Sequence, residues 1–259
     1  MRLLEGQVAL VTGAGGSIGR GIALRFAEEG AAVAVHCRTA MESAREVASR
    51  IQDSGQRAVV LQADLTDEEE CHQLVRAAAE WGGGRLTALV NNAGVQPVRQ
   101  LPGMTAAQWR AVVDTNLASV FACTQAAAEI MRESGGDGEG GGGSVTHIAS
   151  IEGSAPAPGH AHYSASKAAV VMHARSAALE YGPYGIRVNT VSPGLIDREG
   201  LAEAWPEGVR RWHGAAPLGR LGRPKDVGDA CAFLASPLAS WITGHDLVVD
   251  GGVSARPTW

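Results

Sequence analysis

The sequence predicts an α/β protein with a doubly wound parallel sheet that carries helices on both faces. Short apolar segments rich in β-branched residues alternate with longer amphipathic segments along the chain. Several short segments, such as VALV, AVAV and AVVL, are apolar at every position, which is typical of strands covered on both faces. The chain has 259 residues, of which 45% are hydrophobic, enough to bury the core of one large domain. We therefore expect a single domain over residues 1–259.

The individual elements follow from the same alternation. The predicted strands are Gln7–Thr12, Ala32–Cys37, Ala58–Ala63, Ala88–Asn91, Ser144–Ala149, Arg187–Val191 and Asp246–Val249. The predicted helices are Ser17–Glu29, Met41–Asp53, Asp67–Trp81, Ala106–Glu133, Ala161–Tyr181 and Pro224–Leu234. Asp67 suits a helix N-cap, and Pro224 suits a first helical turn.

One segment, residues 135–143, interrupts this alternation. It reads GGDGEGGGG, and such a segment has no apolar side chains to pack into a core. We predict a flexible surface loop that joins a helix to the fifth strand. A linker between two domains is the alternative.

The composition argues against several classes of partner. A net charge of -5 without a basic stripe gives no support for nucleic-acid binding. The pair His160 and His162 lacks a third ligand, so we predict no metal site. No apolar run is long enough to span a bilayer and no leader segment is evident, so we expect a cytoplasmic protein without membrane contact. The cysteines lack metal or redox spacing and are predicted to be reduced: Cys37, Cys71, Cys123 and Cys231.

The segment Thr12–Gly19 reads TGAGGSIG and lies between the first predicted strand and the first predicted helix. Glycine allows the backbone to approach a pyrophosphate closely, and the N-terminus of a helix attracts anions. A glycine cluster alone often marks only a turn. In this strand–turn–helix context it indicates a nucleotide-phosphate site.

Tyr163 and Lys167 are spaced so that both lie on one face of a predicted helix, one turn apart. An ammonium beside a phenol favours the phenolate and would make the tyrosine a proton donor and acceptor near neutral pH. Ser150 precedes Tyr163 by thirteen residues. Helices also carry such pairs by chance, with the lysine on a solvated face.

Together with the glycine turn, these residues resemble the short-chain dehydrogenase/reductase family over essentially the whole chain. Further motifs in the same order carry the resemblance: ADL at 63–65, NNAG at 91–94, DTNLASVF at 114–121, NTVSPGLI at 189–196 and ITGHDLVVDGG at 242–252. The resemblance implies a Rossmann-like sheet of about seven parallel strands. It also implies hydride transfer between a nicotinamide cofactor and a carbonyl or secondary alcohol.

The resemblance implies four catalytic residues: Asn116, Ser150, Tyr163 and Lys167. Tyr163 would exchange a proton with the substrate oxygen, and Lys167 would lower the pKa of Tyr163 and bind the nicotinamide ribose. Ser150 would orient the substrate oxygen, and Asn116 would hold a water that connects Lys167 to solvent. Taken singly, Ser150 could be a turn cap and Asn116 a satisfied polar group of the core.

By the same resemblance, the cofactor would contact a larger set: Gly13, Ser17, Ile18, Gly19, Arg38, Asp64, Leu65, Asn92, Ala93, Gly94, Tyr163, Lys167, Pro193, Gly194 and Ile196. A carboxylate at the end of the second strand would bind the ribose 2′-hydroxyl of NAD(H). Cys37 and then Arg38 stand there instead, which favours the 2′-phosphate of NADP(H). Gly16 carries no second charge, and Arg38 could be only a solvated loop residue, so NAD(H) stays open.

The loop after Ile196 departs from the family pattern, because Asp197 and Arg198 follow where a threonine usually contacts the nicotinamide carboxamide. An arginine there could meet an acidic substrate or lie on the surface. Residues 197–214 form the expected variable substrate loop. Its apolar side chains either form a lid or pack in the core or a subunit interface: Leu201, Trp205 and Trp212.

The substrate and the assembly are the open parts of the sequence prediction. Overall likeness favours a 3-oxoacyl thioester, although no basic docking patch for an acyl carrier protein is evident. A sugar or polyol, or another small ketone, is the alternative within the enzyme class. A non-catalytic NADP(H)-binding sensor is the alternative outside it, but such proteins typically lose the tyrosine or the lysine. The resemblance implies a homotetramer built through the long helices and the C-terminal strand, with a dimer as the alternative.

Overall fold

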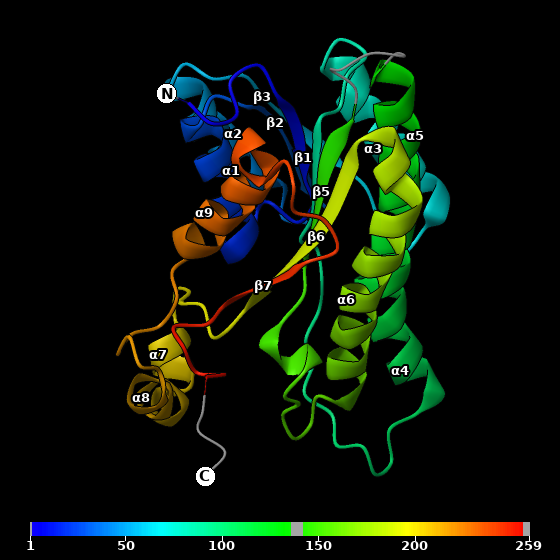
Figure 1. The fold of residues 1–259 in the computed structure, drawn as a ribbon. Helices are drawn as coiled ribbons and strands as arrows, with labels where there is room; N and C mark the ends of the chain where they lie inside the picture. The colour runs from blue at the N-terminus through cyan, green and yellow to red at the C-terminus, as the bar shows by residue number, and fades with distance from the viewer. Residues whose placement is uncertain (1, 136–141, 256–259) are drawn as a thin grey trace.

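Seven parallel strands form the central layer of the computed structural model, which describes residues 2–135 and 142–255 (Figure 1). Their order across the sheet is β3-β2-β1-β4-β5-β6-β7, and every neighbouring pair is parallel. The strands are β1 (Val8–Val11), β2 (Ala32–Cys37), β3 (Ala58–Gln62), β4 (Ala88–Asn91), β5 (Gly143–Ile148), β6 (Ile186–Pro193) and β7 (Asp246–Val249). The predicted doubly wound sheet is confirmed.

Helices cover both faces of this sheet, as Figure 1 shows. One face carries α1 (Ser17–Glu28), α2 (Met41–Asp53) and α9 (Pro224–Ala235). The other face carries α3 (Glu68–Trp81), α5 (Ser119–Gly135) and α6 (Ala161–Tyr181). The short helices α4 (Ala106–Val113), α7 (Leu201–Ala204) and α8 (Pro206–Ala215) lie beyond the carboxyl ends of the strands. Among the described residues, no helix is both long and apolar enough to cross a membrane.

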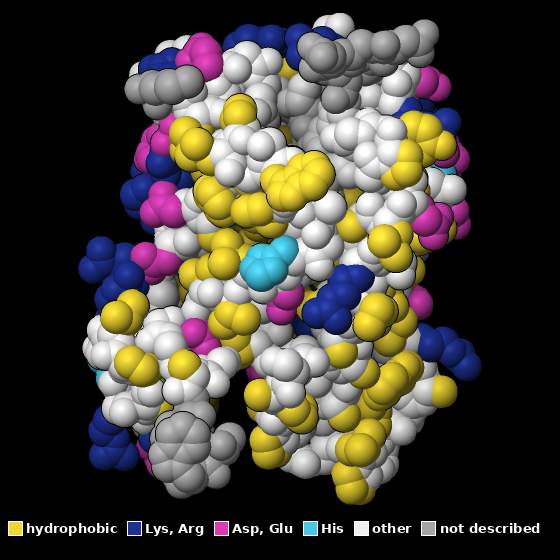
Figure 2. All heavy atoms as spheres, in the orientation of Figure 1, with side chains coloured by type: hydrophobic (Ala, Val, Ile, Leu, Met, Phe, Trp, Pro, Cys, Tyr) yellow, Lys and Arg dark blue, Asp and Glu magenta, His cyan; other side chains and the backbone are white. Residues whose placement is uncertain are grey.

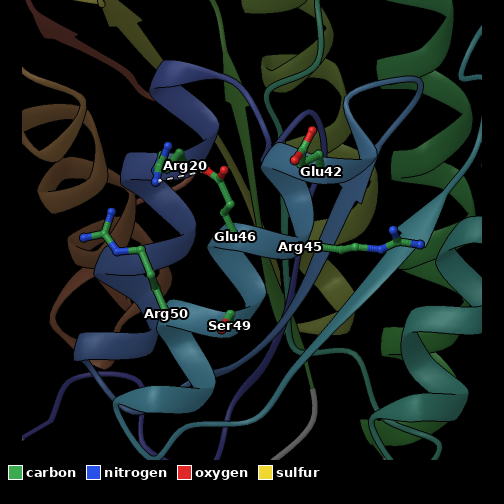
Figure 3. A pocket seen from close by; sticks show the side chains of 6 residues that line it. All are labelled: Arg20, Glu42, Arg45, Glu46, Ser49 and Arg50. Atoms are coloured by element: carbon green, nitrogen blue, oxygen red, sulfur yellow. Dashed lines mark ion pairs between the residues drawn. The ribbon is translucent and has the colours of Figure 1, made fainter.

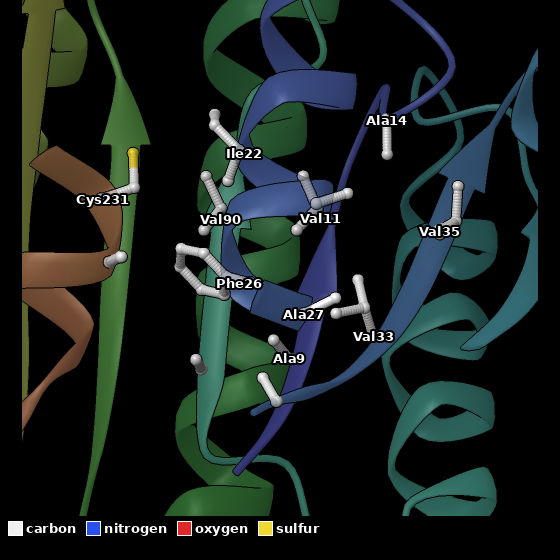
Figure 4. Packing of buried hydrophobic residues seen from close by; sticks show 14 of the residues in the cluster. Ala9, Val11, Ala14, Ile22, Phe26, Ala27, Val33, Val35, Val90 and Cys231 are labelled. Atoms are coloured by element: carbon white, nitrogen blue, oxygen red, sulfur yellow. The ribbon is translucent and has the colours of Figure 1, made fainter. Parts of the chain in front are cut away.

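The core is divided by the sheet into two apolar layers. In the layer under α1 and α9, the side chains of Ile22, Phe26 and Val11 are fully buried (Figure 4). In the layer under α3 and α5, Leu89 and Met131 are equally inaccessible to solvent. Strands that are apolar at every position supply side chains to both layers, which explains the continuous apolar runs in the sequence.

Most predicted boundaries agree with the structure to within two residues. Asp67 caps α3 by accepting hydrogen bonds from two backbone N–H groups, and Pro224 is the first residue of α9. Two features differ. The helix predicted over 106–133 is divided by a π-helical turn, η1 (Asp114–Ala118), and the predicted loop 197–214 contains α7 and α8. Of the predicted glycine loop 135–143, residues 136–141 lie outside the described part of the chain.

The functional end of the sheet is its carboxyl edge. β1 pairs with β2 on one side and with β4 on the other, so the chain reverses its direction of winding between β1 and β4. Ligands of open parallel sheets bind in the crevice that this reversal creates. The glycine turn follows β1 at this point, and the NNAG segment follows β4.

Candidate active site

The glycine turn after β1 is held in a conformation that requires glycine at two positions. Gly13 has a φ of +64°, which L-residues with a Cβ rarely adopt. A Cβ on Gly19 would lie 2.4 Å from the carbonyl oxygen of Gly13 and 2.5 Å from Nδ2 of Asn92. The sequence prediction that this turn needs glycine therefore has a steric cause at Gly13 and Gly19.

His36 on β2 fixes the same turn from the side. Its Nδ1 accepts a 3.0 Å hydrogen bond from the Gly13 N–H, and its Nε2 faces the carbonyl oxygen of Ala63 at 3.1 Å. Burial lowers the pKa of His36, which keeps the ring neutral and leaves Nδ1 free to accept. Sequence reasoning did not single out His36, because a histidine within an apolar strand gives no motif.

The NNAG segment after β4 supports the turn from the other side. The hydroxyl of Thr12 accepts hydrogen bonds from the backbone N–H groups of Asn92 (2.9 Å) and Ala93 (3.0 Å). The Asn92 side chain donates to the carbonyl oxygens of Thr12 (2.8 Å) and Gly13 (3.2 Å). The side-chain amide of Asn92 therefore stabilises the glycine turn. The predicted contact between Asn92 and the cofactor stays a prediction.

These residues fit the phosphate groups of a nicotinamide cofactor. Helix α1 begins at Ser17 with Gly16 as its N-cap, and no side chain caps its first turn. The N–H groups at such a helix end favour an anion, and the missing Cβ atoms leave room for one. Ser17 and Ile18 occupy this first turn, as predicted, and Gly19 lies directly behind them.

Three residues predicted to contact the cofactor, Arg38, Asp64 and Leu65, follow β2 and β3 at the carboxyl edge of the sheet. Cys37 ends β2 and is buried, and the exposed Arg38 follows it. A nitrogen of the Arg38 guanidinium lies 3.9 Å from the Asp64 carboxylate, which also accepts two hydrogen bonds from Thr66. These hydrogen bonds, more than the Arg38 charge, lower the pKa of Asp64. The predicted contact Leu65 turns its side chain into the core.

A shallow groove between α1 and α2 adds further arginines to this region (Figure 3). It is lined by Arg20, Glu42, Arg45, Glu46, Ser49 and Arg50. Arg20 lies 3.7 Å from Glu46, whereas Figure 3 shows Arg45 pointing away from that pair. Burial raises the pKa of the Cys37 thiol, and the positive charge of Arg45 opposes this rise. Arg45 therefore acts electrostatically at the end of β2.

Ser150, Tyr163 and Lys167 come together at the other end of the crevice. Ser150 follows β5, and its hydroxyl accepts a 3.1 Å hydrogen bond from the backbone N–H of Glu152. Tyr163 and Lys167 lie one turn apart on α6, with Nζ of Lys167 5.6 Å from the centre of the Tyr163 ring. Nζ also donates a 2.7 Å hydrogen bond to the carbonyl oxygen of Ile148. The predicted spacing thus places the three side chains beside one another.

The pKa values of this group differ from the sequence prediction. Burial raises the pKa of Tyr163 to about 12, a hydrogen bond with Ser150 opposes this rise, and the charge of Glu152 adds to it. Burial alone lowers the pKa of Lys167 to about 8. In this structure, therefore, burial moves the pKa of Tyr163 upward, opposite to the lowering expected from Lys167.

Asn116 lies in the π-helical turn between α4 and α5 and is fully buried. Its Oδ1 accepts a 2.8 Å hydrogen bond from the Val95 N–H, and its Nδ2 donates to the Val95 carbonyl oxygen at 2.9 Å and to Ser166 at 3.2 Å. A Cβ on Gly94 would lie 3.1 Å from Asn116 and 3.6 Å from Nζ of Lys167. Asn116 thus fixes the NNAG segment next to Lys167.

The loop after β6 closes the crevice. Pro193 ends β6, Gly194 donates to the carbonyl oxygen of Val249 at 3.0 Å, and the buried Ile196 forms a bridge with Gly222. The Ser17 hydroxyl donates to the Asp197 carbonyl oxygen at 3.1 Å. The glycine turn and this loop are therefore in direct contact.

Two tryptophans of the predicted substrate loop pack on glycines. A Cβ on Gly194 would lie 2.6 Å from the ring of Trp212, and the ring of Trp205 covers Gly208 within α8. Arg198 is exposed. Figure 2 shows a hollow at the lower edge of this face, between the part formed by α7 and α8 and the part formed by the loops that precede α6.

Sequence reasoning missed a polar group beside Tyr163. Gln96, Glu152 and His160 are joined by hydrogen bonds. In the sequence, His160 and His162 stand out only as a pair of histidines too few to bind a metal. In the structure, His160 contacts Glu152, whereas His162 is buried and accepts a hydrogen bond from the Tyr163 N–H. Within residues 2–135 and 142–255, no group of three or more His, Cys, Asp or Glu side chains could hold a metal ion.

Comparison with known proteins agrees with this geometry. Residues 13–254 match a family model described as enoyl-(acyl carrier protein) reductase. The chain is 41% identical, over 96% of its length and 97% of that protein, to cis-4-hydroxycyclohexanecarboxylate dehydrogenase of Sinomonas cyclohexanicum. The chain belongs to the short-chain dehydrogenase/reductase family.

Two solved structures of this family superpose closely. A short-chain type dehydrogenase/reductase from Mycobacterium marinum has a TM-score of 0.87 at 35% identity, with 98% of this chain and 97% of that chain covered. A 7α-hydroxysteroid dehydrogenase, complexed with NADH and 7-oxo glycochenodeoxycholic acid, has a TM-score of 0.89 at 35% identity, covering 96% and 94%. As a member of this family, the protein is a nicotinamide-dependent oxidoreductase that acts on CH–OH or C=O groups.

Proposed function

We propose that this protein interconverts a secondary alcohol on a ring and the corresponding ketone, with NADP(H) as the preferred cofactor. One observation carries the proposal: Lys167 lies beside Tyr163 at the carboxyl edge of the sheet, near the glycine turn. Ser150 contacts Tyr163, and Gly94 lies close to Lys167. A bound nicotinamide supplies the hydride in reduction or accepts it in oxidation. The residues of the chain supply the geometry and the proton.

In ketone reduction, the Tyr163 hydroxyl gives its proton to the substrate oxygen, and in alcohol oxidation the tyrosine takes that proton back. Ser150 donates a hydrogen bond to the same oxygen and stabilises the charge that develops there. Lys167 contributes positive charge close to Tyr163, and Asn116 keeps Gly94 and Val95 in place beside Lys167. Tyr163 has a pKa of about 12 and so stays protonated at neutral pH, which suits a proton donor.

Support for a ring alcohol comes from the relatives. One is named for a hydroxycyclohexanecarboxylate, and one solved neighbour holds a keto steroid conjugate. The names of these relatives do not support the 3-oxoacyl thioester expected from the sequence. The test compares cyclohexanone derivatives, acetoacetyl-CoA and keto sugars by the absorbance of the reduced nicotinamide. We expect kcat/KM to be highest for cyclic ketones, and a preference for the thioester or for sugars would overturn this choice.

Preference for NADP(H) is supported by the charges at the end of β2. Cys37 offers no carboxylate to the ribose, Arg38 is exposed beside it, and Arg45 acts on the same strand end. Guanidinium groups bind a 2′-phosphate through paired hydrogen bonds. The measurement is kcat/KM with NADPH and with NADH, and an Arg38→Ala variant should lose the difference. A preference for NADH in the unchanged protein would refute the cofactor choice.

A homotetramer is likewise a proposal. Apolar side chains are exposed on the outer faces of α5 and α6 and around β7: Phe121, Met172, Leu179, Leu238, Trp241 and Val248. Figure 2 shows hydrophobic side chains gathered over the region before β7. Exposed apolar patches of this kind commonly mark subunit contacts. Light scattering coupled to size-exclusion chromatography should give four times the monomer mass, and a monomer would contradict the proposal.

A further inference from the structure

Three polar side chains that have no part in the proton transfer described above converge beside Tyr163. Gln96 follows the NNAG segment, Glu152 lies in the short 3-10 helix η2 (Ile151–Gly153), and His160 precedes α6. Nε2 of Gln96 donates to Oε1 of Glu152 at 2.8 Å, and Nδ1 of His160 lies 2.9 Å from Oε2 of Glu152. We call these three residues the Glu152 cluster.

The surrounding structure holds the Glu152 cluster in place. The side chains of Glu152 and His160 are only 17% and 18% exposed. The loops that carry the cluster are joined by a 2.8 Å hydrogen bond from the Arg99 N–H to the Gly159 carbonyl oxygen. The Ser164 hydroxyl, in the first turn of α6, also points to Glu152 at 3.4 Å. Glu152 and His160 come from different segments and are largely buried, so they are not an incidental surface ion pair.

The cluster adjoins both Tyr163 and Ser150. The rings of His160 and Tyr163 meet edge to face with 6.1 Å between their centres. The Glu152 N–H donates to Ser150, the residue that would orient the substrate oxygen. The charge of Glu152 also contributes to the raised pKa of Tyr163, which places the carboxylate within electrostatic reach of the phenol.

The unused atoms of the cluster define what it can recognise. In the described part of the chain, Oε1 of Gln96 and Nε2 of His160 have no hydrogen-bond partner. The remaining lone pairs of the Glu152 carboxylate also accept hydrogen bonds. Such a site accepts a hydrogen bond from a neutral hydroxyl group and repels a second carboxylate.

We infer that the Glu152 cluster is a specificity subsite for a second hydroxyl group on the substrate ring, and that it discriminates against a carboxylate substituent. This inference rests on the proposed ring-alcohol function and adds the substituent that the ring should carry. The substrate preference of this protein would then differ from that of its relative named for a carboxylate-bearing ring.

The test measures kcat/KM for cyclohexanone, for 2-, 3- and 4-hydroxycyclohexanone and for 4-oxocyclohexanecarboxylate, with whichever reduced nicotinamide the enzyme oxidises faster. For at least one hydroxyketone we expect a preference over cyclohexanone of about 10- to 100-fold, the range of one hydrogen bond to a charged group. The carboxylate should be the poorest substrate. In Glu152→Gln the preference for the hydroxyketone should shrink, and the rejection of the carboxylate should weaken.

Two further variants make the result specific to the cluster. Gln96→Met replaces an exposed side chain with an apolar one of similar length and should reduce the same preference. Glu80→Gln, on the solvent side of α3, changes the same charge far from the cluster and should leave all the ratios as they are. Binding of the reduced nicotinamide, followed by fluorescence, shows that each variant is folded.

Each outcome decides the matter. A wild-type enzyme that reduces cyclohexanone and the hydroxyketones equally well overturns the inference and leaves the proposed function intact. Equal losses on all ketones in Glu152→Gln would show that the cluster only positions Tyr163, which also overturns it. If the enzyme reduces no cyclic ketone, the proposed function fails and the inference fails with it.

Discussion

Nζ of Lys167 lies 5.6 Å from the centre of the Tyr163 ring while it donates a hydrogen bond to the carbonyl oxygen of Ile148. Lys167 is buried and Tyr163 is partly buried, and desolvation moves their pKa values in opposite directions. The pKa of Lys167 falls to about 8, and that of Tyr163 rises to about 12. In the free protein, Lys167 is therefore the member of the pair that titrates closer to neutral pH.

This relationship predicts the pH dependence of ketone reduction. If the reaction needs the Lys167 ammonium, kcat/KM should be level below pH 8 and fall about tenfold per pH unit above it, because kcat/KM reports the pKa values of the free enzyme. Tyr163 stays protonated throughout this range. In Lys167→Arg, any activity that survives should lose this fall, because arginine keeps its charge. A level profile up to pH 10 in the unchanged enzyme would contradict the assignment.

The same burial predicts that Lys167 destabilises the free protein. The fall in the pKa of Lys167 from its ordinary 10.5 to about 8 in the folded protein corresponds to about 3 kcal/mol of lost stability. A variant without the lysine would recover this, less about 1 kcal/mol for the hydrogen bond to Ile148 that it also loses. This cost is complete below pH 8 and fades as the pH rises toward 10.5, where the unfolded chain also loses the proton. Lys167→Met should therefore increase the free energy of unfolding at pH 7, measured in urea, and the gain should shrink at pH 10. A loss of stability at pH 7 would contradict this prediction.

Much of the fold could be predicted from the sequence because the strands are buried on both faces. The runs at 32–37 and 88–91 are apolar with few exceptions, and their predicted boundaries match β2 and β4. Tyr163 and Lys167 could be placed together because helical periodicity fixes residues four apart on one face. By contrast, α7 and α8 were not predicted, since their sequence resembles a charged loop and Trp212 packs on Gly194, which lies in a different segment.

The electrostatics of the site could not be predicted in the same way. The sequence shows that a lysine is near a tyrosine, but it does not show how much water either side chain keeps. Nor does a sequence reveal that Gln96, Glu152 and His160 meet, because they come from three segments and form no motif. The π-helical turn at Asn116 is equally hidden, since its residues are compatible with a regular helix.

Gly19 should be far less tolerant of a side chain than its neighbour Gly16. The Cβ of Gly19→Ala would meet backbone and side-chain atoms within 2.6 Å, so we expect a loss of stability of about 1–3 kcal/mol and weaker cofactor binding. Gly16→Ala is the matched control, because its Cβ would have its nearest neighbour at 3.5 Å and its φ is −85°. Nicotinamide binding and thermal unfolding measure both effects. Equal behaviour of the two variants would refute the steric account of the turn.

The hydroxyl group of Thr12 should contribute more to the stability of the protein than its methyl group does. Thr12→Val would leave the N–H groups of Asn92 and Ala93 without their acceptor, at a cost of about 1–3 kcal/mol for each buried group that is left unpaired. Thr12→Ser keeps the hydroxyl and should cost less, although it loses a methyl group. Unfolding in urea compares the two variants. A valine variant as stable as the serine variant would show that these hydrogen bonds contribute little.

The variant Tyr163→Phe shows whether Tyr163 exchanges the proton with the substrate oxygen. The measurement is single-turnover reduction of a cyclic ketone, together with the affinity for the reduced nicotinamide determined by fluorescence. We expect the rate to fall by about 10²–10⁴-fold, the range for a lost general acid, while the affinity for the cofactor stays nearly unchanged. A variant that keeps more than about a tenth of the rate, while binding the cofactor normally, would contradict it.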